Sequence, residues 1–169
     1  RERGYTDAQM VESFLLLLCA GGECLDDFDL LRGDRGLARL MDHELPSSSK
    51  ARQFLYTFHD EEILKGRPER EEQAAWVPRE SARLKGLARV NAELVRAIDA
   101  ASPERVSRAT IDADATIIES HKREALSHYK DGRGYQPHLA YWVERDLIVA
   151  DQFRDGNVPA GQDPLSLAK

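Results

Sequence analysis

The stretch that decides the fold is TIDADATII, residues 110–118, in which apolar and polar residues alternate. Alternation with a period of two is typical of a half-buried β-strand, whose successive side chains point to opposite faces. It places the odd-numbered isoleucines and alanines on one face and Asp112 and Asp114 on the other. Because Asp is disfavoured inside strands, two on one face call for a reason. A divalent cation is one reason, and simple hydration of an exposed face is the other.

Two more strands follow this one. Tyr135–Val143 comes after a turn at Lys130–Gly134, and Leu147–Phe153 comes after the tight connection Glu144–Asp146. Short connections favour antiparallel pairing of the second and third strands. A helix beginning near Ala160 is expected after them.

The chain before residue 110 has helical patterns instead. Thr6 is suited to cap a helix that runs to about Ala20, because a threonine side chain can accept the free amides of the first turn. Apolar spacings of three and four predict further helices. They cover Glu23–Leu31, Asp34–Met41, a segment from the Ser47 cap to Phe58, and a longer amphipathic helix at Arg79–Ala100. The fold class is therefore α+β.

The charge of the 169-residue chain is unevenly distributed. Residues 1–78 carry the whole net charge of −6, and residues 79–169 are neutral. The charged stretch His59–Pro78 is interpreted as a connection. We therefore expect a helical region at 1–78, with a DNA-binding or dimerisation role, and a connecting helix with a sheet at 79–169. The acidic balance excludes nucleic-acid binding by bulk charge, so any such contact must be local.

Two other classes are excluded by simple counts. The longest apolar run, Phe14–Ala20, is about a third of the ~20 residues that a membrane-spanning helix needs. Cys19 and Cys24 do not form a disulfide framework of the secreted type. A reducing cytoplasm is the expected location.

Local DNA contacts have two candidate places. Lys50, Arg52 and Gln53 lie near the start of the fourth helix, where a helix entering a DNA groove makes its contacts. Lys130 and Arg133 lie in the turn before the second strand and are suited to phosphate. A plain helical bundle with solvated charges is the alternative interpretation.

Several stretches, taken in order, resemble a bacterial insertion-sequence transposase of the DDE type, whose catalytic domain has the ribonuclease H-like fold. They are GYTD at 4–7, LPSSS at 45–49, IDADAT at 111–116, YKDGRGYQP at 129–137 and FRDGN at 153–157. The resemblance implies the first, antiparallel three-stranded part of that fold in residues 79–169.

The resemblance also implies a chemistry. Asp114 matches the family's first catalytic carboxylate, and Asp112 either assists in metal binding or flanks it. An Asp, Asp, Glu trio would hold two Mg²⁺ (or Mn²⁺) ions that activate water or a 3′-hydroxyl for attack on a DNA phosphodiester. The DNA partner would be the terminal inverted repeats of a mobile element, and a homodimer is left open.

The second Asp and the Glu of this trio are expected beyond Lys169. Asp151 lies within the third strand, and Asp155 and Asp163 follow it, so none takes the second position. We therefore expect a truncated transposase that is inactive alone.

Two alternatives stay open. Asp112, Asp114 and Thr116 also spell the DxDxT motif of haloacid dehalogenase-like phosphatases, with Asp112 as nucleophile and Asp114 as general acid and base. That motif ends a buried parallel strand, whereas apolar residues follow the aspartates here. The other alternative is a non-catalytic remnant that binds DNA or dimerises.

Overall fold

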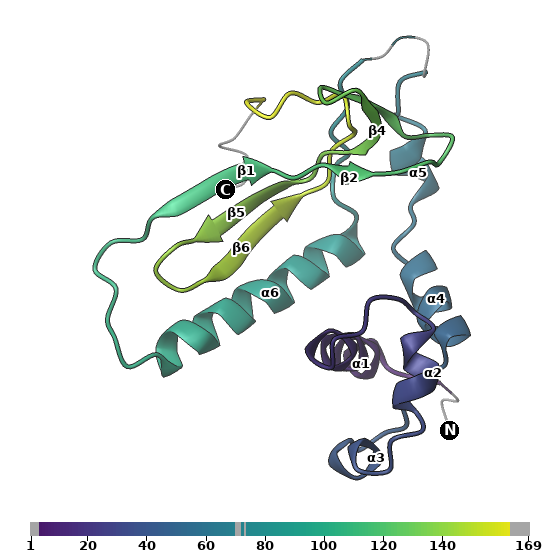
Figure 1. Ribbon diagram of the computed structural model, residues 1–169, viewed down its shortest axis with the longest axis vertical. Coiled ribbons are helices and arrows are strands. Elements are labelled where there is room, and N and C mark those ends of the chain that lie inside the picture. The colour runs from purple at the N-terminus through teal and green to yellow at the C-terminus, as the bar shows by residue number, and fades with distance from the viewer. Residues whose placement is uncertain (1–3, 70–71, 73, 163–169) are drawn as a thin grey trace. The chain divides into compact units, whose positions relative to one another are not determined.

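The computed structural model describes residues 4–69, 72 and 74–162. The chain forms two compact units, Arg1–His59 and Asp60–Lys169 (Figure 1). This division falls at the start of the stretch that was expected to connect the two halves, and our domain assignment of 1–78 and 79–169 stays a prediction. Among the described residues, no helix has the length and apolar character needed to cross a membrane.

The first unit is helical. Its helices are α1 (Asp7–Cys19), α2 (Asp27–Leu31), α3 (Leu37–Leu40) and α4 (Ser48–Tyr56). α1 begins as predicted, because Thr6 accepts the Gln9 amide and the Gln9 side chain accepts the Thr6 amide. α2 and α3 begin later than predicted. Instead, the Asp27 carboxylate accepts the amides of Glu23 and Cys24 just before α2. The Asp34 carboxylate accepts the amides of Gly36 and Leu37 at the start of α3.

A small aromatic core holds these helices together. Met10 and Leu17 of α1 pack with Phe28 and Ala51, all at least nine-tenths buried. The Phe14 and Phe28 rings meet edge to face at 5.3 Å between centroids. This geometry is favoured over a face-to-face stack by the ring quadrupoles.

The second unit contains α5 (Glu61–Leu64) and the long helix α6 (Ala82–Ala101). α6 starts three residues later than predicted, because Ser81 is extended and its hydroxyl accepts the Leu84 amide. The helix runs along the main sheet, where the Asn91 side chain donates to the Ile148 carbonyl at 3.1 Å. The long helix therefore backs the sheet that carries the two aspartates.

The main sheet consists of β1 (Ile111–Ala115), β5 (His138–Trp142) and β6 (Leu147–Gln152). The strands lie in the order β1-β5-β6 and all pair antiparallel. The predicted α+β class with a three-stranded antiparallel sheet is confirmed. β1 is shorter than expected, since the chain leaves the sheet after Ala115.

A second sheet was not predicted. It contains β2 (Ile118–Glu119), β3 (Leu126–His128) and β4 (Gly132–Tyr135), in the order β2-β4-β3. The segment expected to be a turn thus contributes a strand, and the turn itself lies just before it, where Asp131 has a positive φ of 58°. Gly134 allows the close pairing, because a Cβ there would lie 2.2 Å from the Ile118 carbonyl oxygen.

Two charged residues just after β6 are buried. Arg154 and Asp155 are each 1% exposed. Arg67 donates to Asp155 twice, from Nη2 to Oδ1 at 2.8 Å and from Nε to Oδ2 at 3.3 Å. Most of the helix expected from Ala160 onward lies outside the described residues.

Candidate functional site

The two aspartates of β1 share one face of the main sheet. Asp112 pairs with Tyr141 and Asp114 with Leu139 in an antiparallel register, with the Ala113–Ala140 pair between them. Since side chains alternate along a strand, both carboxylates project from the same face. Both residues are exposed, and β1 lies at the edge of the sheet as described (Figure 1).

The carboxylates have few partners of their own. Asp114 Oδ1 accepts the amide of the next residue, Ala115, at 2.8 Å. In the described part of the chain, no side chain donates a hydrogen bond to Asp112, and no Lys or Arg pairs with either carboxylate. Two carboxylates on an exposed face, with no cationic side chain beside them in the described chain, suit a hard cation such as Mg²⁺. This ion keeps several waters and takes one or two protein carboxylates as ligands.

A third aspartate lies on this face. Asp151 of β6 pairs with Leu139, which itself pairs with Asp114, so the register puts both aspartates on one side of the sheet. Their strands are separated by β5, roughly 9–10 Å from backbone to backbone. This distance argues against one ion shared by Asp114 and Asp151.

The face of Asp151 could not be read from the sequence. A register shift in the pairing of β5 with β6 lies between Ala140 and Tyr141. Such a bulge changes which residues of β6 point to which face. Only the observed pairing places Asp151 with Asp114.

His138 supports β1 from its other face. It pairs with Ala115 and is 2% exposed. Burial lowers the pKa of His138, and the charge of Arg154 lowers it further, against the smaller opposing effects of a hydrogen bond with the Ala113 backbone and of the charge of Asp114. The lowered pKa favours a neutral imidazole at pH 7 beside the strand that carries the aspartates.

The candidate DNA contacts of the first unit lie on α4. Lys50, Arg52 and Gln53 are all exposed, and Lys50 Nζ donates to Gln53 Oε1 at 3.1 Å. These side chains lie in the first two turns of a helix capped by Ser47. They form an accessible polar surface at the helix start.

The candidate contacts of the second unit differ from each other. Lys130 is exposed, with its ammonium 5.6 Å from the centre of the Tyr129 ring. Arg133 instead donates to three backbone carbonyls, those of Lys122, Arg123 and Ala125, at 2.7 to 2.9 Å. Its guanidinium therefore shapes the loop before β3.

Comparison with known proteins gives one family. The model of the family described as "Transposase DDE domain group 1" matches residues 2–168. No curated protein and no solved structure matches the chain. The match spans nearly every residue, including the strand that carries Asp112 and Asp114, so this chain belongs to the transposase DDE domain family, group 1.

Proposed function

We propose that this chain provides the first carboxylates of the metal centre of a DNA transposase. Asp114 is the first catalytic carboxylate, and Asp112 assists it in holding the ion. The observation that carries this proposal is the pair of exposed carboxylates, without a cationic partner in the described chain, on one face of β1. In a family of transposase domains, such a pair is a natural ligand set for the reaction's cation.

The cation expected there is Mg²⁺ or Mn²⁺. Bound divalent ions lower the pKa of a nucleophilic water or hydroxyl and stabilise the leaving oxygen of a phosphodiester. Asp114 and Asp112 would supply carboxylate oxygens from one side. Because Asp151 is two strands away, the proposal assigns the second Asp and the Glu of the centre to segments other than those described. Residues 1–169 alone are then expected to cleave no DNA.

The DNA partner in this proposal is the terminal inverted repeats of a mobile element. Lys50, Arg52 and Gln53 present donors from the start of α4, and Lys130 adds an ammonium beside the exposed Tyr129 ring. Such donors fix a protein on the phosphate backbone. We assign Arg133 the indirect role of holding its loop, because its donors already contact three carbonyls.

The phosphatase alternative rests on the DxDxT spelling of residues 112–116 alone. Its nucleophile would need a buried parallel strand, whereas β1 is exposed and pairs antiparallel with β5. The strand therefore favours the transposase proposal over the phosphatase, and the cleavage test below separates it from a non-catalytic remnant.

The test uses a transposase that contains this chain and a DNA duplex bearing the element's end. Asp114→Ala should lower the rate of Mg²⁺-dependent strand cleavage by more than about a hundredfold, since even outer-shell partners of metal ligands are worth ten- to a hundredfold. Asp151→Asn is the matched control, because it removes an exposed carboxylate from the same face, and its cleavage rate should change little. Equal rates for Asp114→Ala and the parent protein would refute the assignment.

A further inference from the structure

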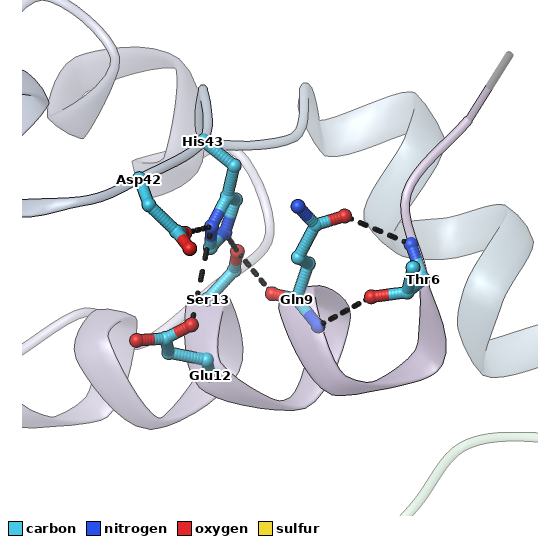
Figure 2. A network of polar contacts seen from close by, with 6 residues as sticks. All are labelled: Thr6, Gln9, Glu12, Ser13, Asp42 and His43. Atoms are coloured by element: carbon cyan, nitrogen blue, oxygen red, sulfur yellow. Dashed lines mark hydrogen bonds and ion pairs between the residues drawn. The ribbon is translucent and has the colours of Figure 1, made fainter. Parts of the chain in front are cut away.

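A buried histidine in the first unit lies against two carboxylates (Figure 2). His43 follows α3 in the chain, and its side chain is 5% exposed. Its ring lies between α1, which carries Glu12 and Ser13, and its own neighbour Asp42. Residues far apart in sequence thus converge on one imidazole.

The hydrogen bonds of Ser13 decide the state of this ring. Ser13 Oγ lies 2.7 Å from the Gln9 carbonyl, which can only accept, so the hydroxyl proton is donated there. The same Oγ lies 3.2 Å from His43 Nε2 and must accept from it. In the neutral imidazole, the proton is therefore on Nε2 and the lone pair is on Nδ1.

That lone pair faces negative charge. His43 Nδ1 lies 2.9 Å from Asp42 Oδ1 and 3.9 Å from Glu12 Oε2. A lone pair and two carboxylates directed at one point repel one another unless a positive charge lies between them. A second proton on the ring supplies such a charge, and so does a bound metal ion.

We propose that Glu12, Asp42 and His43 bind a divalent transition-metal ion, with Zn²⁺ as the best match. The three ligand atoms lie within 4.8 Å of one another. Zn²⁺ binds His nitrogen and carboxylate oxygen at about 2.0–2.2 Å, which puts tetrahedral ligands roughly 3.3 Å apart. The two Nδ1 distances lie on either side of this value, so small side-chain rotations complete the site.

The donor set distinguishes this site from the proposed centre on β1. One imidazole nitrogen with two carboxylates suits Zn²⁺ and its neighbours in the first transition row, whereas Mg²⁺ prefers oxygen alone. Asp42 and Glu12 are 89% and 59% exposed in their side chains, so water has access for the fourth position. Asp42 and His43 are also among the residues that line a hollow of about 600 Å³.

The consequence of binding would be structural. Glu12 comes from α1, and the other two ligands come from the segment that follows α3. In the same region, the Tyr5 hydroxyl donates to the Leu45 carbonyl at 3.2 Å. An ion would join the same two parts of the unit more firmly, and ligand binding to the folded state alone raises stability.

A hydrolytic Ser-His-Asp triad is not the better interpretation of this cluster. Ser13 is fully buried, so no substrate carbonyl can reach its hydroxyl. Its proton is also donated to Gln9, whereas a nucleophilic serine needs the histidine as its proton acceptor. The hydrogen bonds therefore leave Nδ1 of His43 available as a metal ligand and do not activate Ser13 as a nucleophile.

The test uses the 169-residue chain, stripped with EDTA and titrated with ZnCl₂ by calorimetry, with thermal unfolding as a second readout. The parent chain should bind one Zn²⁺ and unfold at a higher temperature, while MgCl₂ should give no such shift. Glu12→Gln should weaken Zn²⁺ binding by at least about tenfold. It is chosen because Glu12 is exposed and makes the longest contact, so the chain should still fold.

Glu44→Gln is the matched control, since Glu44 is exposed beside His43 and lines the same hollow. It should retain the affinity of the parent chain for Zn²⁺. Co²⁺ should give the visible absorption of a four-coordinate site in the parent chain and in Glu44→Gln, and less in Glu12→Gln. Absence of Zn²⁺ binding, or equal binding by Glu12→Gln and Glu44→Gln, would overturn the proposal. Neither result depends on transposase activity.

Discussion

The second unit contains a buried aspartate, Asp155, and the two exposed aspartates of β1, Asp112 and Asp114, whose surroundings differ. Asp155 is 1% exposed and held by two hydrogen bonds from Arg67. Asp112 and Asp114 are exposed on β1, with no Lys or Arg paired to them in the described chain. A buried carboxylate with its own arginine serves the fold, whereas a carboxylate left open can accept a cation from outside.

The pKa of Asp155 reflects this enclosure. Burial raises it above its ordinary value of 3.8, and the charge and hydrogen bonds of Arg67 act against that rise. A carboxyl whose folded pKa is raised favours folding at pH values below 3.8, and this contribution is lost as the pH rises through the folded pKa. At neutral pH, the ion pair with Arg67 offsets the cost of burying the Asp155 carboxylate.

The largest expected effect comes from removing that arginine. Arg67→Met should lower the free energy of unfolding at pH 7 by about 3 kcal/mol, because it leaves a buried carboxylate unpaired. The deficit should shrink as the pH falls and Asp155 takes up a proton. Urea unfolding of the chain at several pH values measures both effects.

Arg96→Met is the control for this loss. Arg96 is exposed on α6, and among the described residues it pairs with Glu93 alone, one turn away, so its removal should cost less than about 0.5 kcal/mol. Similar losses for the two variants would show that enclosure does not distinguish the two kinds of carboxylate.

The next effect tests the backbone packing around Asp155. Gly134→Ala should cost about 2 kcal/mol, because the new Cβ would clash with the Ile118 carbonyl oxygen of the neighbouring strand. Gly86→Ala in α6 meets open space and should instead stabilise the chain by about 0.5–1 kcal/mol. Thermal unfolding of both variants should show midpoints that move in opposite directions. A midpoint for Gly134→Ala at or above that of the parent would contradict the close packing.

Sequence reasoning identified the parts of this comparison that depend on local chemistry. Thr6 and Ser47 cap helices as expected, because their hydroxyls accept nearby amides, and the alternation in 110–118 placed Asp112 and Asp114 together. The cap at Ser81 was missed, because the helix was predicted to start at Arg79. The predicted helix starts failed where a carboxylate such as Asp34 took the amides first.

Long-range pairings were out of reach of the sequence. Arg67 and Asp155 are 88 residues apart, and His43 and Ser13 are 30 apart, with no periodic signal to connect them. The strand at Gly132–Tyr135 was hidden because its glycines are typical of turns, yet they are what lets neighbouring backbone approach.

A smaller effect concerns His138, which pairs with Ala115 of β1. The pKa of His138 is lowered by burial, so the folded chain disfavours the proton that the unfolded chain accepts. Its contribution to stability is therefore complete above the ordinary value of 6.5 and is lost as the pH falls through the folded pKa. Replacing it in His138→Gln should flatten the slope of unfolding free energy against pH below 6.5. An unchanged slope would mean that another group causes it.

The smallest expected change in stability is at the open aspartates. Asp112→Asn should alter the free energy of unfolding by less than about 0.5 kcal/mol, because the side chain is exposed and contributes no hydrogen bond in the described chain. Urea unfolding beside Arg67→Met measures the contrast. A loss comparable to that of Arg67→Met would assign Asp112 to the fold.

The central claim, that Asp114 binds the reaction's cation directly, is tested most directly by changing the ligand atom. A transposase containing this chain with Asp114→Cys should lose DNA cleavage in Mg²⁺, which takes thiolate poorly, and regain cleavage in the softer Mn²⁺. Equal loss in both ions, or full activity in Mg²⁺, would contradict the account.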